Sequence, residues 1–90
     1  MLRVVRTRQF KKDSKKLRSS GGDIEKLLVV VDDLRNNRPL AERYRDHQLI
    51  GKWKDYRECH VLPDWLLLYK KTATELILNR TGSHSQLFGK

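Results

Sequence analysis

The chain has 90 residues, 38% of them hydrophobic and 34% charged, so it can bury one small core but not two. We therefore expect a single domain spanning residues 1–90. Twenty lysines and arginines against eleven acidic residues give a net charge of +9, which favours a polyanionic partner; a basic surface with no partner is the alternative.

The N-terminal part predicts a short strand followed by a basic helix. Residues 2–5 are β-prone, and Thr7 can cap a helix that reaches about Arg18. Phe10 and Leu17 lie seven positions apart on one face of this helix, which leaves a thin apolar seam and a broad cationic face. Residues 1–18 hold eight basic side chains and one acidic side chain, so the positive field is concentrated here.

A second, more apolar helix follows the break at residues 19–22. Asp23 can cap it, and the sequence from Asn36 to Pro39 ends it. The spacing predicts a core-facing stripe made of Ile24, Leu27, Leu28, Val31 and Leu34. The two helices are expected to form a hairpin packed on a sheet.

The second half predicts a sheet. Residues 40–51 look irregular, and three strands are then expected at residues 53–61, 65–70 and 76–80. Pro63-Asp64 marks a tight turn before a central strand buried on both faces, and residues 82–90 suit a short turn or helix. The order β-α-α-β-β-β predicts an α+β fold with the N-terminal helical hairpin on a mostly antiparallel four-stranded sheet.

All three histidines, His47, His60 and His84, lie in this half. An unperturbed pKa of about 6.5 lets histidine both take and give a proton near neutrality. RNA brings its own nucleophile, the 2′-hydroxyl, so a base, an acid and a phosphate-binding cation can cleave it. His60 and Asp64 flank one turn and can approach each other, and Arg80, whose fork suits phosphate, brackets the strand end with His84.

Each of these residues also has an ordinary structural interpretation. His60 can be a surface-strand histidine, Asp64 a turn former and Arg80 an exposed cation. Trp65 is more often a core residue than a base-stacking platform, whereas Phe88, in a polar C-terminal segment, could stack on a base. The residues alone therefore indicate a basic RNA-binding domain with the parts of a metal-free ribonuclease.

The cysteine count and the lengths of the apolar runs limit which disulfides, cofactors and membrane spans are possible. Cys59 is the only cysteine, which excludes an intrachain disulfide and favours a buried, inert thiol in a reducing compartment. The histidines lack the close paired spacing of a zinc site, so no metal or other cofactor is expected. Apolar runs reach only five residues, too few for a membrane span, so we expect a soluble, cytoplasmic protein.

Two segments of the second half carry distinctive motifs. From residue 46 the chain reads D-H-x-L-x-G-x-W, then Y-R-x-x-H-V-x-P-D-W and an apolar strand. From residue 80 it reads R-T-G-x-H, followed by L-F-G at 87–89. In this order the motifs resemble those of the YafQ branch of the RelE/ParE toxin superfamily. The match covers about half of the chain strongly, whereas the N-terminal helices match in layout only. The resemblance implies a RelE-like fold.

The resemblance also implies a type II toxin that enters the ribosomal A site and cleaves mRNA without a metal. It implies a cognate antitoxin, usually with a ribbon-helix-helix DNA-binding part. DNA is then expected to be bound only through the toxin–antitoxin complex. Carried over, His47, His60, Asp64 and His84 form the catalytic group, and Arg80 stabilises the phosphate. The residues expected to support the site or bind RNA are Trp65 and Phe88, with Lys11, Lys12, Lys15 and Lys16 as ribosomal RNA contacts.

The division of labour stays open, with His84 or Asp64 as the base and His47 or His60 as the acid. Two other functions fit the same fold. A ParE-like gyrase poison needs no acid–base residues, which the three histidines argue against. A non-catalytic module that binds RNA or an antitoxin is the second alternative.

Overall fold

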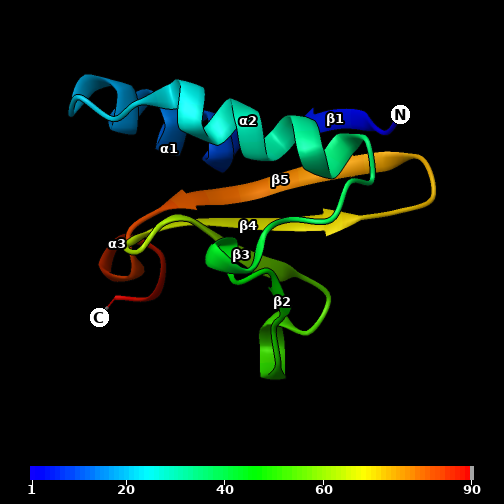
Figure 1. Cartoon of the computed structure of the whole chain (residues 1–90). Coiled ribbons are helices and arrows are strands. Elements are labelled where there is room, and N and C mark those ends of the chain that lie inside the picture. Colours follow the sequence, from blue (N-terminus) through cyan, green and yellow to red (C-terminus); the bar gives the residue numbers. More distant parts are fainter. Residues whose placement is uncertain (90) are drawn as a thin grey trace.

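The computed structural model describes residues 1–89 and contains one sheet with helices on both faces (Figure 1). The elements are β1 (Arg3–Arg6), α1 (Arg8–Ser19), α2 (Ile24–Arg35), β2 (His47–Gln48), β3 (Arg57–Leu62), β4 (Trp65–Lys71), β5 (Glu75–Gly82) and α3 (His84–Phe88). Two short 3-10 turns, Glu42–Tyr44 and Gly51–Trp53, flank β2. No helix within residues 1–89 is long and apolar enough to cross a bilayer.

The sheet has five strands in the order β1-β5-β4-β3-β2. β1 runs parallel to β5, and the other neighbours are antiparallel. The α+β class and a mostly antiparallel sheet are confirmed, but the predicted count of four strands is corrected to five, with one parallel pair. β2 escaped prediction because it has two residues, too few to show an alternating pattern.

The helical hairpin covers one face of the sheet, as the sequence predicts (Figure 1). The Thr7 hydroxyl accepts a hydrogen bond from the Phe10 N–H at 3.0 Å, and the Asp23 carboxylate accepts one from the Glu25 N–H at 3.1 Å. Each side chain satisfies a backbone donor that a helix start leaves unpaired. Both predicted caps are therefore confirmed, and they fix where the two helices begin.

Three of the five residues predicted for the core stripe of α2 are buried, whereas Ile24 is only partly buried and Val30 takes the place of Leu28. Leu27, Val30, Val31 and Leu34 are buried, whereas Leu28 is half exposed. Residues 27–31 are all apolar, so the sequence does not define which of them face inwards, and packing on the sheet decides. The consequence is an aliphatic surface on the outer side of α2.

β4 separates two apolar clusters, as expected of a central strand buried on both faces. Trp65 and Tyr69 pack beneath α1 and α2, whereas Leu66 and Leu68 pack on the other face against Leu87 of α3. In the neighbouring β3, Cys59 is buried, as predicted, and burial raises the pKa of its thiol to about 12. β3 begins only at Arg57, because residues 51–53 form a turn rather than the predicted strand.

Candidate active site

The three histidines meet on the sheet face opposite the helical hairpin, where β2, β3 and α3 come together. The ring centroids of His47 and His60 are 6.4 Å apart, and those of His60 and His84 are 5.8 Å apart. His47 comes from β2, His60 from β3 and His84 from the first residue of α3. Three imidazole groups thus share one surface, although the first and the last are 37 positions apart in the chain.

A sharp turn before β2 orients His47. Arg45 adopts a left-handed conformation with φ of 47°, which costs a non-glycine residue about 1 kcal/mol or more. The turn brings the Arg45 carbonyl oxygen to 2.6 Å from Nδ1 of His47. Between them, the Asp46 carboxylate accepts a hydrogen bond from the Tyr69 hydroxyl, so this loop is tied to the central strand.

The Pro63-Asp64 turn forms as predicted, but it pairs Asp64 with a different histidine. Nδ1 of His60 lies 3.1 Å from the Pro63 carbonyl oxygen. The Asp64 carboxylate instead accepts hydrogen bonds from Nδ1 of His84 at 3.0 Å and from its backbone N–H at 3.2 Å. The hydrogen bond from His84 holds the pKa of Asp64 below its usual value. The expected His60–Asp64 contact is therefore corrected to an Asp64–His84 pair.

The residues around His84 fix the start of α3. Ser83 and Gln86 form a reciprocal capping box, with Ser83 accepting from the Gln86 N–H and Gln86 accepting from the Ser83 N–H. Gly82 has φ of +150°, and a side chain there would meet the Gln86 amide at 2.6 Å. Phe88 follows one turn later, with its ring 6.4 Å from the His84 ring and partly exposed beside it.

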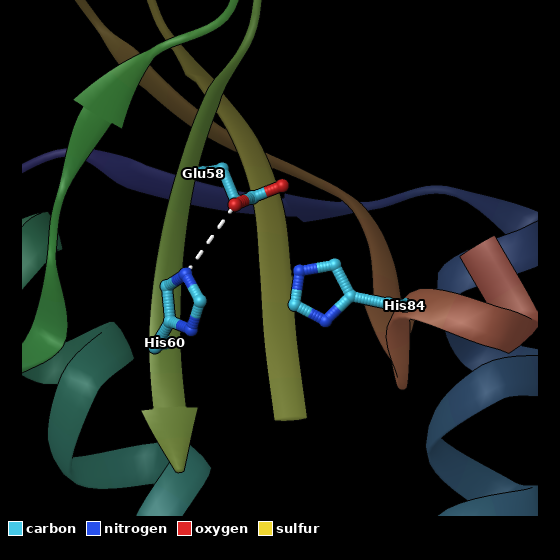
Figure 2. Close-up of side chains that lie close together, drawn as sticks. All are labelled: Glu58, His60 and His84. Atoms are coloured by element: carbon cyan, nitrogen blue, oxygen red, sulfur yellow. Dashed lines mark ion pairs between the residues drawn. The ribbon is translucent and has the colours of Figure 1, made fainter. Parts of the chain in front are cut away.

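Glu58 is a site residue that the sequence analysis missed. Its side chain is only 8% exposed, and Oε1 lies 3.5 Å from Nε2 of His47. The same oxygen lies 3.4 Å from Nε2 of His60, and Figure 2 draws this pair. A buried carboxylate requires compensating partners, and these two imidazoles are placed to provide them. Glu58 is two residues before His60, so the two-residue period of a strand puts both on one face; that period was the available signal.

Hydrogen-bond partners distinguish the histidines from one another. A carbonyl oxygen only accepts, so Nδ1 of His47 and Nδ1 of His60 must each carry a proton. Their Nε2 atoms both face the Glu58 carboxylate, at 3.5 Å from His47 and 3.4 Å from His60. His84 donates from Nδ1 to Asp64, and its Nε2 makes no hydrogen bond within residues 1–89. Among the described residues, Nε2 of His84 is therefore the ring nitrogen left without a hydrogen-bond partner, whereas Nε2 of His47 and Nε2 of His60 each lie against a carboxylate.

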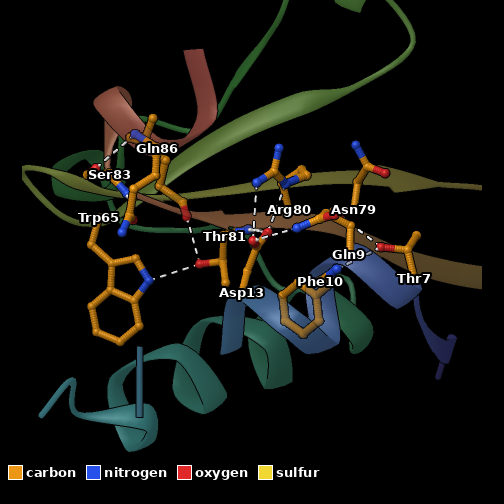
Figure 3. Close-up of polar contacts among 11 residues, drawn as sticks. Thr7, Gln9, Phe10, Asp13, Trp65, Asn79, Arg80, Thr81, Ser83 and Gln86 are labelled. Carbon is orange, nitrogen blue, oxygen red and sulfur yellow. Dashed lines mark hydrogen bonds and ion pairs between the residues drawn. The ribbon is translucent and has the colours of Figure 1, made fainter. Parts of the chain in front are cut away.

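Arg80 does not join this cluster. It donates to both carboxylate oxygens of Asp13 in α1, from Nε at 2.8 Å and Nη2 at 3.1 Å (Figure 3). The Thr81 N–H donates to the same carboxylate at 3.2 Å. Burial alone would raise the pKa of Asp13, but the hydrogen bonds led by Arg80 outweigh it and the pKa is lowered. The arginine predicted to bind phosphate thus ties α1 to the end of β5.

The predicted RNA-contact residues divide into buried and exposed sets. Trp65 lies in the core beneath the helices, where its indole N–H donates to the Thr81 hydroxyl at 2.9 Å. The expectation that Trp65 contacts bases is corrected, because only 6% of the residue is exposed. The four lysines are all exposed on α1, at positions Lys11, Lys12, Lys15 and Lys16.

Comparison with known proteins now identifies the family. A family model described as the bacterial toxin of type II toxin–antitoxin system, YafQ, matches residues 2–89. The chain belongs to the YafQ toxin family. The mRNA interferase toxin YafQ of Escherichia coli K12 is 46% identical over 82 residues, which cover 90% of this chain and 89% of that relative.

Solved structures of YafQ-family size match over nearly the whole chain. The E. coli DinJ–YafQ complex has a TM-score of 0.91 at 42% identity, covering 99% of this chain and 100% of its counterpart. A copper-bound mutant toxin from Helicobacter pylori has a TM-score of 0.94 at 46% identity, covering 98% and 100%. The mixed five-stranded sheet is therefore the fold of this family.

A group of three side chains in this YafQ-family site could also hold a metal ion. Glu58, His60 and His84 each offer one ligand atom, and these atoms lie within 4.8 Å of one another (Figure 2). Imidazole nitrogen with carboxylate oxygen suits zinc or copper. No metal was expected because the histidines are widely spaced along the chain. The fold nevertheless brings His60 and His84 close together in space.

Proposed function

We propose that this YafQ-family toxin is an mRNA interferase that cuts translated mRNA in the ribosomal A site and is restrained by a cognate antitoxin. The observation that carries the proposal is the grouping of His47, His60 and His84 on one open surface with unequal hydrogen-bonding states. A 2′-hydroxyl needs a base with a free lone pair, and the leaving oxygen needs an acid with a proton. The cluster supplies both.

In the proposed reaction, Nε2 of His84 takes the proton of the RNA 2′-hydroxyl. The 2′-oxygen then attacks the adjacent phosphorus, and the bond to the 5′-oxygen breaks. His60 or His47 gives a proton to the departing 5′-oxygen, which leaves a 2′,3′-cyclic phosphate. Asp64 holds the His84 ring through Nδ1, so that Nε2 faces the substrate. The N–H groups of the two rings beside Glu58 also stabilise negative charge on the phosphoryl oxygens.

A direct test maps mRNA 5′ ends by primer extension after the chain is induced in cells. The expected result is cuts in phase with codons, which His84→Ala reduces by about 10²–10⁴-fold because it removes the base. Ser85→Ala is the matched control, since Ser85 is the exposed neighbour in α3. Growth arrest with intact mRNA and broken DNA would instead indicate a gyrase poison. Arrest without either lesion would indicate a non-catalytic module.

The basic face of α1 is proposed to contact ribosomal RNA. Reversing the charges of Lys11, Lys12, Lys15 and Lys16 should weaken co-sedimentation with ribosomes and flatten its salt dependence, because each lost phosphate contact lowers the slope by about 0.7–0.9. The same four positions changed to arginine keep the charge and serve as the control. Unchanged co-sedimentation of the reversed variant would contradict the assignment.

A further inference from the structure

The turn that carries His47 is held on one face of the sheet, whereas the His47 ring lies on the other. His47 pairs with Glu58 in the two-residue strand β2. Successive residues of a strand point to opposite faces, so the side chains of Asp46 and His47 project in opposite directions. The Asp46 carboxylate bonds to Tyr69, which packs in the core beneath the helices. Asp46 therefore fixes, from the helix side of the sheet, the turn that presents His47 on the other side.

Three side chains form this attachment, which we call the Asp46 anchor: Asp46, Arg57 and Tyr69. The Tyr69 hydroxyl donates to Oδ1 of Asp46. Nε of Arg57 donates to the same oxygen at 3.2 Å and to the Tyr69 hydroxyl at 3.3 Å. Arg57 and Tyr69 lie opposite each other in the pairing of β3 with the central strand β4, so both donors stand on the middle of the sheet. Tyr69 is fully buried, and burial raises the pKa of its phenol, so the hydroxyl keeps the proton that it donates.

The Asp46 anchor stabilises a turn that is strained and weakly paired. β2 contributes only two residue pairs, and both of its residues are exposed. Arg45, just before Asp46, has a left-handed φ of 47°, which a non-glycine residue keeps only where the surrounding contacts enforce it. That conformation places the Arg45 carbonyl oxygen 2.6 Å from Nδ1 of His47. The Asp46 side chain is only 25% exposed, so water competes poorly for its hydrogen bonds. Without the anchor, Arg45 can relax, and the His47 ring then loses the acceptor that fixes it.

We infer that Asp46, held by Arg57 and Tyr69, is a positioning residue that sets where the His47 ring lies in the active site. Asp46 bonds on the face of the sheet away from the histidine cluster, so it acts on the reaction only through His47. A misplacement of about 1 Å of a reacting group can cost about 10²-fold in rate. The inference rests on the proposed function in taking His47 as a group that acts on RNA.

The test is a double-mutant cycle on the full-length toxin, measured as single-turnover cleavage on programmed ribosomes. Asp46→Asn and Tyr69→Phe should each lower the maximal rate about ten- to a hundredfold and leave the toxin concentration at half-maximal rate unchanged. Either change added to His47→Ala should cause no further loss, because the ring that the anchor positions is already gone. Asp55→Asn and Tyr56→Phe make the same chemical changes outside the Asp46 anchor and should cleave as the wild type does.

A second measurement follows the His47 ring directly. NMR of the imidazole nitrogens in the full-length chain reports which ring nitrogen carries the proton. Nδ1 of His47 is expected to carry it in the wild type, because the Arg45 carbonyl oxygen can only accept. Asp46→Asn should shift the ring resonances of His47 and leave those of His84 unchanged. Thermal unfolding confirms that the variant is folded.

Each other outcome overturns the inference. An equal loss of cleavage in the His47→Ala background means that the anchor supports the whole site and not one ring. A higher half-maximal concentration at an unchanged maximal rate assigns Asp46 to ribosome binding. Unchanged His47 resonances in a folded Asp46→Asn chain mean that the anchor does not set the ring. If Asp46→Asn does not fold, Tyr69→Phe, which removes only a hydroxyl, decides by the same two measurements. If the wild-type chain cleaves no mRNA, the proposed function fails, while the NMR shifts still decide whether the anchor holds His47.

Discussion

Two aspartates hold the chain where β5 ends and α3 begins, and each acts as a clamp by accepting hydrogen bonds from one side chain and one backbone N–H. Asp13 accepts hydrogen bonds from the Arg80 side chain and from the Thr81 backbone N–H. Asp64 accepts from the side chain and the backbone N–H of His84. They differ in exposure, because the Asp13 side chain is 10% exposed and the Asp64 side chain is 73% exposed.

Burial, more than residue type, therefore decides whether such a carboxylate supports the fold or orients a reacting side chain. A buried carboxylate that loses its partners leaves donors without hydrogen bonds, so Asp13 acts on stability. An exposed carboxylate loses little stability because water replaces it, yet it still sets which ring nitrogen of His84 is free. Arg80 and His84 are four residues apart, and we expect one to hold the fold and the other to act on substrate.

The largest expected effect comes from removing the exposed clamp. Asp64→Ala should reduce single-turnover cleavage on programmed ribosomes about 10²-fold, because His84 loses the acceptor that orients it. The free energy of unfolding should change by no more than about 0.5 kcal/mol, since the side chain is exposed. Asp55→Ala, at another exposed aspartate, is the control. A large loss of stability would show that the two clamps do not differ as described.

The buried clamp should give the opposite result. Asp13→Ala should lower the free energy of unfolding by about 1–3 kcal/mol in urea titrations, because Arg80 and the Thr81 N–H lose their acceptor. Cleavage per folded molecule should fall far less than in Asp64→Ala. Arg80→Lys tests the same clamp from the other side, since lysine lacks the fork that spans two carboxylate oxygens. If the Arg80→Lys variant keeps the wild-type free energy of unfolding but does not cleave mRNA, the result would support the original prediction that Arg80 stabilises the phosphate.

The smallest effect is a pH dependence of stability at the buried clamp. The pKa of Asp13 is lowered in the folded chain, so its contribution is present above the unfolded pKa of about 3.9 and is lost as pH falls through the folded value. The stability gap between the wild type and Asp13→Asn should therefore be widest above about pH 5 and narrow below about pH 4. Chemical denaturation from pH 7 to pH 3 measures it. A gap that widens on acidification would contradict the assigned pKa direction.

Local signals in the sequence predicted much of this fold. The caps Thr7 and Asp23, the Pro63-Asp64 turn and the doubly buried β4 each depend on nearby residues, and all are confirmed. The parallel pairing of β1 with β5 depends on residues more than seventy positions apart, for which strand patterns carry no signal. β2 depends on its neighbour β3 for its existence.

The candidate site was predictable as a set of residues but not as a set of contacts. The motifs picked out His47, His60 and His84, which the structure brings together. Which carboxylate meets which ring depends on the direction of the turn and on α3, so Asp64 was paired with the wrong histidine. Glu58 was overlooked because a single acidic residue in a strand is usually exposed, and only the sheet shows that it is buried.

The pairing of β1 with β5 has a consequence for how the toxin is made. Arg3 emerges from the ribosome early, but its partner Glu75 is 72 residues later in the chain. Until then, β1 has no strand to pair with, and α1 has no β5 to anchor its Asp13. Such long-range pairing delays folding until the partners are both present. A toxin that is still being translated therefore lacks the folded sheet that positions His84. The ribosome that synthesises the chain meets it before its active site has formed.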